Sequence, residues 1–122
     1  MKINELKIEA IIGKVRQMAT ERRENRYRVC AANGSCGYEH GICTDETIGC
    51  IFGQAFLALG VTPENMPVGG TICYVLGHHD VTHDFVELDW CRLVQGNQDR
   101  GEPWGSCVGA ADRNYPQVKE AA

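Results

Sequence analysis

Three cysteines and a histidine in the first half of the sequence are the residues best suited to bind a metal ion. They are Cys30, Cys36, His40 and Cys43, and Cys50 follows them. A structural Zn²⁺ site takes four thiolate or imidazole ligands in a tetrahedron, so three cysteines and one histidine form a suitable set. The sequence lacks the Cys-x-x-Cys pair that recurs in such sites. We therefore favour buried free cysteines and keep zinc as the alternative.

A second polar cluster lies in the second half of the chain. His79 and His83 are four residues apart with Asp80 between them, and two imidazoles with a carboxylate suit a transition metal. No third ligand on a regular element can be named. We interpret residues 77–84 as a polar turn that ends in an acidic residue at a helix N-terminus, where negative charge is favourable.

The sequence contains no recognisable catalytic motif. Nucleophilic catalysis needs a serine or cysteine beside a base and an oxyanion site, and none of the seven cysteines and four histidines lies in such a turn motif. The glycine patterns of phosphate loops and dinucleotide sites are absent. We expect a protein that is not an enzyme and needs no cofactor.

Composition indicates one domain in the cytoplasm. The 122 residues are 43% hydrophobic, which is enough to bury a core. A net charge of −4 at pH 7 argues against a general nucleic-acid binder. No apolar run approaches the roughly 18 residues that span a bilayer, and the charged N-terminus lacks a signal-peptide core. The odd cysteine count excludes a complete disulfide framework.

The elements that position these residues are expected to be mainly helical. Apolar residues recur at helical spacing over 1–21, which predicts an amphipathic N-terminal helix with Asn4 as its N-cap. The apolar run 48–59 should form the most buried helix, and Gly60 should end it in a left-handed conformation.

Three further helices are expected in the second half of the chain. Residues 71–76 contain strand-forming residues, but their place between two helices favours a helix. The next helix covers about 82–98 and is broken at Gly101. The last helix covers about 103–114.

The fold class that follows is mainly α with a small β component (α+β). Asn33-Gly34 lies between short alternating runs and predicts a β-hairpin near residues 27–39. We expect a compact bundle of about five helices with this short hairpin. Residues 1–122 should form one globular domain, and residues 115–122 should be a flexible tail.

Five residues have a structural interpretation. Gly49 and Gly53 are four apart and would share a helix face that another backbone can approach closely. Gly101, Pro103 and Trp104 predict a corner between two helices. Proline suits the first position of a helix because its missing N–H has no partner there in any case.

The N-terminal helix and the basic segment after it are a candidate interaction surface. The apolar stripe of the helix could dock on its own domain or pair with a second copy to form a homo-oligomer. For the arginines we favour a solvated helix end, because Glu21 and Glu24 offset half of the charge. The residues of this surface are Ile8, Ile11, Ile12, Val15, Arg22, Arg23 and Arg26.

Two segments resemble a known family. Gly49-Cys50-Ile51-Phe52-Gly53-Gln54-Ala55-Phe56, continuing to Leu59-Gly60-Val61, is similar to its first motif. Its second motif is matched by Val94-Gln95, Gln98-Asp99, Gly101, Pro103-Trp104-Gly105, Val108 and Ala111-Asp112. The family consists of small uncharacterised proteins of mycobacteriophages and their actinobacterial hosts. This chain departs from it at Phe56, where leucine is usual, and at Cys107, where alanine is usual.

The resemblance implies a phage accessory protein and supplies no catalytic residues. We expect a non-enzymatic protein that binds a host or phage protein in the host cytoplasm and modulates a host process. A zinc-stabilised module is the first alternative. The second is a helix-turn-helix DNA-binding regulator, although residues 95–112 offer only Arg100 as a phosphate contact, with Asp99 and Glu102 beside it. Nucleic acid and membrane partners are not expected.

Overall fold

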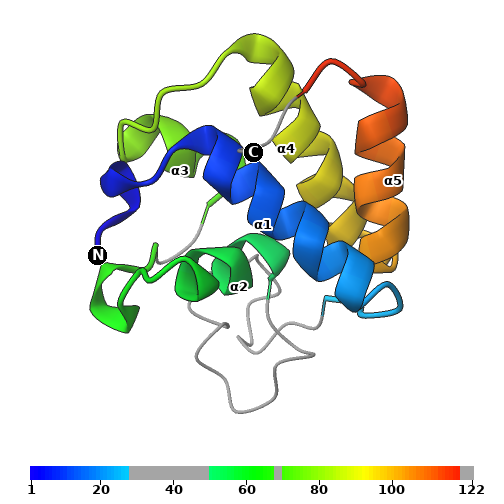
Figure 1. The fold of residues 1–122 in the computed structure, drawn as a ribbon, viewed down its shortest axis with the longest axis horizontal. Helices are drawn as coiled ribbons and strands as arrows, with labels where there is room; N and C mark the ends of the chain where they lie inside the picture. Colours follow the sequence, from blue (N-terminus) through cyan, green and yellow to red (C-terminus); the bar gives the residue numbers. More distant parts are fainter. Residues whose placement is uncertain (28–49, 68–69, 119–122) are drawn as a thin grey trace.

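The computed structural model describes residues 1–27, 50–67 and 70–118 (Figure 1). These residues form five α-helices and two single 3₁₀ turns and contain no strand. The elements are η1 (Ile3–Glu5), α1 (Ile8–Glu21), α2 (Ile51–Ala58), η3 (Pro63–Asn65), α3 (Ile72–His78), α4 (Phe85–Asp99) and α5 (Trp104–Asn114). The mainly helical fold is confirmed. The predicted hairpin stays a prediction, because residues 28–39 lie outside the described residues.

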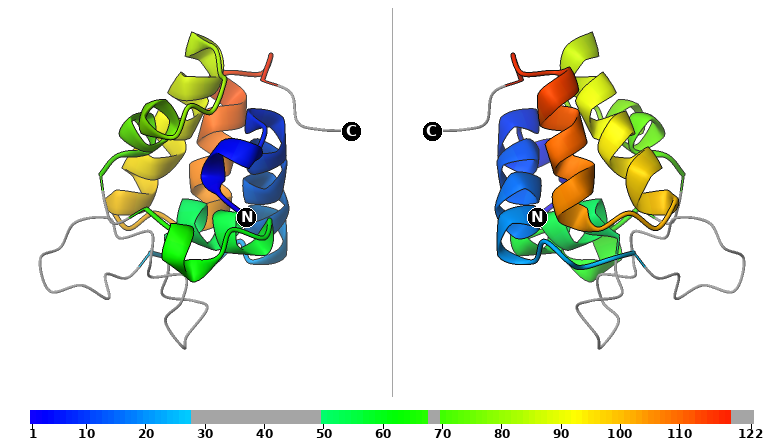
Figure 2. Two further views of the ribbon diagram at one scale, coloured as in Figure 1. Left: turned by 90° about the vertical axis from the view of Figure 1, so that its left-hand side faces the viewer. Right: turned by 90° about the vertical axis from the view of Figure 1, so that its right-hand side faces the viewer.

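Helix α5 lies between α1 and α4, and these three helices form one layer (Figure 2). Helix α2 crosses the end of this layer and contacts α1 and α4. Helix α3 packs on α4 at the opposite side from α5 (Figure 1). Every helix therefore contacts α4 or α1, and α4 is the element that joins α3 to the rest.

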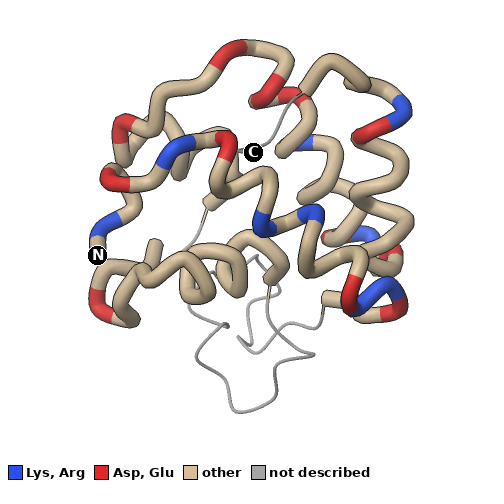
Figure 3. The backbone as a smooth tube through the Cα atoms, viewed as in Figure 1, with Lys and Arg blue, Asp and Glu red and all other residues tan. Residues whose placement is uncertain are grey.

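Helix α2 is the most buried of the helices, as its apolar sequence predicted. The first six of its eight residues, Ile51 to Phe56, are all buried, and no charged residue occurs along it (Figure 3). Gly53 is among the buried residues, while Gly49 lies outside the described residues. Gly60 adopts a φ of +102° just after the helix, which confirms the predicted left-handed end.

The starts of two helices differ from the prediction. Asn4 is not the N-cap of α1, because it lies within η1 and the extended residues Leu6 and Lys7 separate that turn from the helix. The burial of Ile3 in the core fixes this separate turn. Helix α4 begins at Phe85, three residues later than predicted.

A capping box explains where α4 begins. The side chain of Asp84 accepts the backbone N–H of Glu87 at 2.7 Å, and the Glu87 carboxylate accepts the backbone N–H of Asp84 at 2.9 Å. Both interactions satisfy donors that a helix N-terminus leaves without partners. The Asp-x-x-Glu sequence was the signal for this start.

The region 71–76 is helical, as predicted, and forms most of α3. The side chain of Thr71 accepts the backbone N–H of Tyr74 at 3.2 Å, so an N-cap overrides the strand preference of the apolar residues. At the other end of the chain, Val118 is buried and its carbonyl accepts a hydrogen bond from Arg16. The predicted flexible tail therefore does not begin at residue 115, and residues 119–122 lie outside the described residues.

The apolar stripe of α1 faces the chain's own core. Its side chains are covered by α2 and α5 and are at most 2% exposed; they are Ile8, Ile11, Ile12 and Val15. The idea that these residues pair with a second copy is therefore wrong, because the stripe already has its partners within one chain.

Candidate interaction surface

The structure does not test the candidate zinc site. Cys30, Cys36, His40 and Cys43 all lie outside the described residues, so the zinc alternative stays a prediction. Among the residues that are described, no three His, Cys, Asp or Glu side chains form a group that could hold a metal ion.

The histidines around the turn after α3 are used locally. His83 Nδ1 lies 2.7 Å from the carbonyl oxygen of Val81. Burial lowers the pKa of His79, and the neighbouring His78 lowers it further, while Asp80 opposes the change. Asp80 itself adopts a left-handed φ of +57°. These features fit the interpretation as a polar turn.

Two glutamines of α4, both in the second of the two motifs, lie at the starts of other helices. The side-chain oxygen of Gln98 accepts the backbone N–H of Ile51 at 2.6 Å. The side-chain oxygen of Gln95 accepts the backbone N–H of Ile72 at the same distance. Both glutamines are buried, and each satisfies a donor at a helix N-terminus that has no partner within its own helix. No local pattern in the sequence indicates this role.

The predicted corner lies at the start of α5, and the turn after α1 docks on it. The backbone N–H of Trp104 donates to the carbonyl of Asn25 at 2.7 Å, and that of Gly105 donates to the carbonyl of Arg23 at 3.0 Å. Gly101 has a φ of +88°, which confirms the predicted break. Pro103 lies one position earlier than predicted, as the N-cap of α5 with a ψ of 149°.

Close approach of backbones explains the glycine of the Pro-Trp-Gly sequence. A Cβ atom on Gly105 would lie 3.3 Å from the Cα of Arg23 and 3.1 Å from its Cβ. Such distances are too short for a backbone that is held by two hydrogen bonds. Gly105 therefore lets the turn after α1 dock on α5.

Asp112, the last residue of the same motif, also joins helices to one another. Its Oδ1 accepts hydrogen bonds from Arg16 Nε at 3.0 Å, from Arg16 Nη2 at 2.8 Å and from the indole N–H of Trp90 at 2.9 Å. The Arg16 guanidinium also lies 5.3 Å from the Trp90 ring centre, within the range of a cation–π interaction. One carboxylate thus joins α1, α4 and α5.

The three predicted surface arginines also contribute to this docking. Arg22 Nη1 donates to Gln54 of α2 at 3.4 Å, and the Arg26 guanidinium donates to the carbonyl of Gly101. Arg23 docks through its backbone, as described above. The segment is therefore more than a solvated helix end, because it holds the turn after α1 to both α2 and the corner.

The described cysteines divide into buried and exposed thiols. Burial raises the pKa of Cys91, and it raises that of Cys107 to about 11. Cys50 is buried as well. Thiols of this kind are poor nucleophiles, which agrees with the interpretation as core residues. Cys73 is exposed on α3.

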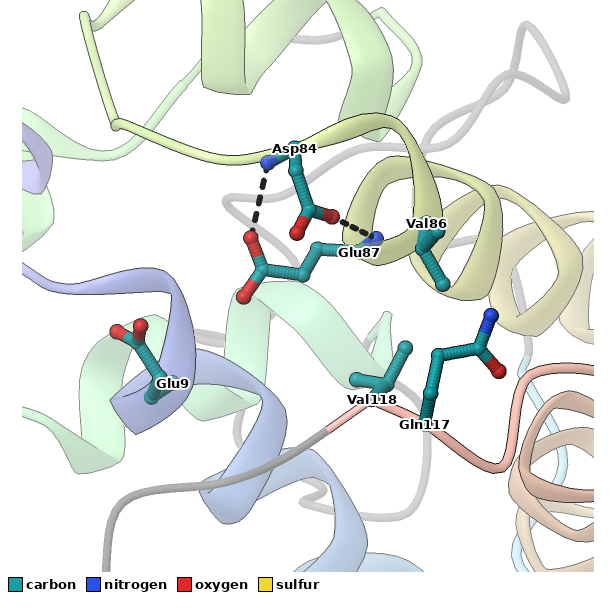
Figure 4. A pocket seen from close by; sticks show the side chains of 6 residues that line it. All are labelled: Glu9, Asp84, Val86, Glu87, Gln117 and Val118. Carbon is teal, nitrogen blue, oxygen red and sulfur yellow. Dashed lines mark hydrogen bonds between the residues drawn. The ribbon is translucent and has the colours of Figure 1, made fainter.

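A shallow pocket of about 280 Å³ lies between the start of α4, α1 and the C-terminal segment (Figure 4). Carboxylates of Glu9, Asp84 and Glu87 line it together with Val118. Asp84 and Glu87 are joined in the capping box, as the dashed lines in the figure show. The acidic residues are therefore explained largely by the helix start.

An exposed aromatic side chain on α3 stacks on a histidine of the same helix. Tyr74 is 58% exposed, yet its ring stacks on His78 with the ring centres 5.1 Å apart and an angle of 14° between the planes. The ring also lies near Gly70, where a Cβ would come within 3.2 Å of Tyr74 Cδ1. Gly70 has a φ of +96°, which favours glycine as well.

We define the α3 face as the exposed residues Cys73, Tyr74, Gly77 and His78. A groove of about 340 Å³ lies beside it, between α3 and α4, with Arg92 and Asp99 in its wall. The face offers a stacked aromatic ring, a thiol, an imidazole and an adjoining polar groove. This combination suits contact with another macromolecule better than chemistry on a small substrate. The sequence alone does not distinguish this face from the rest of a helix followed by a polar turn.

Comparison with family models, curated proteins and solved structures finds no match to this chain. The family resemblance stated from the two motifs therefore stays a prediction. Within the described ranges, no helix has both the length and the apolar character that crossing a bilayer requires.

Proposed function

We propose that this protein is not an enzyme and acts by binding another protein through the α3 face. The exposure of Tyr74 and the stacking of its ring on His78 carry the proposal. Interfaces are enriched in tyrosine at the positions that contribute most binding energy. A ring that already stacks on His78 and lies near Gly70 loses little conformational freedom when a partner covers it.

The roles of the motif residues support the same proposal. Gln95, Gln98 and Asp112 each join two or more helices, and Gly105 joins α5 to the turn after α1. Polar residues that would otherwise suggest a site are thus explained by the fold. The α3 face is different, because its exposed side chains contribute little to the core.

The resemblance to phage-encoded proteins supports an accessory role in the cytoplasm of an actinobacterial host. The partner is then a host or phage protein whose activity the binding modulates. Zinc binding and helix-turn-helix DNA binding stay as alternatives from the sequence.

Affinity capture tests the proposal. Immobilised wild-type protein, a Tyr74→Ser variant and a Phe85→Ser variant are compared in an actinobacterial lysate. Phe85 is the matched control, since it is 85% exposed at the start of α4 and belongs to another surface. We expect one protein to be retained by the wild type and the control and lost from the Tyr74 variant. Equal retention by all three, or no retention, contradicts the proposal.

A further inference from the structure

A groove of about 310 Å³ runs along the outer side of the contact between α1 and α5. The two helices are antiparallel, since Arg16 pairs with Asp112 and Arg23 lies at Gly105. Most residues of its lining that carry no charge are small, and Arg23 already covers Gly105 among them. These uncharged residues are Ala19, Thr20, Gly105, Val108 and Gly109.

Arg23 lines this groove, and Arg113 lies beside Gly109 of its lining; neither has an ion-pair partner among the described residues. The guanidinium carbon of Arg23 lies 3.3 Å from the position that a Cβ would take on Gly105, and Arg113 Nη1 lies 3.3 Å from the corresponding position on Gly109. Within the described part of the chain, neither guanidinium has a hydrogen-bond or ion-pair partner. We call these two arginines and the lining between them the arginine groove.

The acidic residues nearby do not neutralise the arginine groove. Asp112 lines it but is already paired with Arg16 at 2.8 Å. Glu21 accepts a hydrogen bond from Gln17 at 2.9 Å and is not part of the lining. On a chain with a net charge of −4, the groove is therefore a local site of uncompensated positive charge.

We infer that the arginine groove binds an extended acidic segment of a partner protein. Guanidinium groups pair with carboxylates through two parallel hydrogen bonds, so two exposed arginines suit the acidic side chains of an extended peptide. A nucleic acid fits less well, because its binding draws on many basic contacts along a run of phosphates and this surface offers two arginines. The inference rests on the proposed function and adds the chemistry of the partner.

Binding of labelled hexaglutamate, measured by fluorescence anisotropy, tests the inference. Wild-type protein should bind it, with affinity that falls as salt increases, and should not bind hexaglutamine. A dT₁₂ oligonucleotide serves as the nucleic-acid probe. The Arg23→Gln, Arg113→Gln double variant should bind hexaglutamate about tenfold more weakly, because two exposed ion pairs are lost.

Two further variants distinguish binding in the groove from nonspecific attraction to positive charge elsewhere on the protein. Lys7→Gln with Lys14→Gln removes the same charge from α1 and its N-cap, outside the groove, and should change the affinity less than about twofold. Thr20→Tyr keeps both arginines and fills the groove, and it should weaken binding as much as the arginine variant. Circular dichroism confirms that each variant retains its helices.

Three results would overturn the inference: wild-type protein that does not bind hexaglutamate, equal losses in the arginine and lysine variants, or tighter binding of the oligonucleotide. Each leaves the proposed function open to its own test. The capture experiment depends on Tyr74 on α3, whereas the arginine groove lies on α1 and α5. Loss of capture only on Tyr74 substitution, together with failure of the peptide assay, would reject the groove alone.

Discussion

The side-chain oxygen of Gln98 lies 2.6 Å from the backbone nitrogen of Ile51, 47 residues away in the chain. Gln98 is fully buried, and so is the N–H that it accepts. One turn earlier on α4, Gln95 does the same for Ile72. Helix α4 therefore fixes the first turns of both α2 and α3, and through α3 it positions the aromatic face proposed to bind a partner.

Replacing Gln98 with methionine keeps the side-chain length and removes the acceptor. The N–H of Ile51 would then be buried without a partner, and the free energy of unfolding should fall by about 1–3 kcal/mol. Urea denaturation followed by circular dichroism measures this. Gln117→Met is the control, since Gln117 is exposed, and it should change stability by less than about 0.5 kcal/mol. Equal effects would show that Gln98 does not cap α2.

Two glycines of neighbouring helices should respond in opposite ways to alanine. Gly105→Ala places a Cβ 3.3 Å from the Cα of Arg23 and should destabilise the protein by about 1–3 kcal/mol. Gly96→Ala meets only the end of the Arg100 side chain, at 4.0 Å, and should stabilise α4 by about 0.5–1 kcal/mol. Thermal denaturation compares the two. A neutral or stabilising Gly105→Ala would refute the close docking of the turn on α5.

The two buried tryptophans should differ when each is replaced by phenylalanine. The Trp90 indole N–H donates to the Asp112 carboxylate at 2.9 Å. Within the described part of the chain, the Trp104 indole N–H has no partner, although the ring is fully buried. Trp90→Phe should therefore cost about 1–3 kcal/mol more than Trp104→Phe, because only the former breaks a hydrogen bond to a charged group. Chemical denaturation of both variants decides the order.

Asp99 should make stability depend on pH. Burial raises its pKa above the ordinary value of 3.8, and the hydrogen bond that Gln98 donates opposes the shift. The folded state therefore takes up this proton more readily than the unfolded state. The contribution of Asp99 to the free energy of unfolding is largest near and below pH 3.8, the ordinary pKa of the group. It is lost as the pH rises through the higher pKa of the folded state.

The variant Asp99→Asn keeps an oxygen acceptor for Gln98 and removes the charge. It should be more stable than wild type at pH 7, and the difference should shrink as pH is lowered toward 4. Denaturation midpoints at four pH values between 4 and 7 measure the trend. A gap that stays constant with pH would mean that Asp99 has an ordinary pKa in the folded protein.

Residue patterns within one helix were predictable from the sequence. The apolar run of α2 and the break at Gly101 follow from local periodicity and backbone preference, and the structure confirms them. The start of α4 was also encoded locally in the Asp84–Glu87 capping box, although the prediction placed it three residues too early.

Relations between distant segments were not predictable in the same way. Nothing near Gln98 in the sequence indicates that it caps α2, and nothing near Gly105 indicates that Arg23 approaches it. For the apolar stripe of α1, the local pattern was clear but its partner was not. Its periodicity predicted an apolar face correctly, but periodicity alone does not distinguish a partner within the chain from a second copy.

The exposed aromatic ring was hidden for a similar reason. Tyr74 lies in an apolar run, where most side chains enter the core, and only the packing of α3 on α4 decides which of them remain outside. The stacking on His78 and the contact with Gly70 depend on that orientation.

Photo-crosslinking from the α3 face tests the central claim most directly. Benzoylphenylalanine in place of Gly77 leaves Tyr74 intact, and a Cβ there meets nothing within 4 Å. The same group in place of Phe85 is the control on another surface. In an actinobacterial lysate we expect one protein to be crosslinked from position 77 and not from position 85, and to be lost when Tyr74→Ser is added. No crosslinked protein from position 77, or the same products from both positions, would contradict binding through the α3 face.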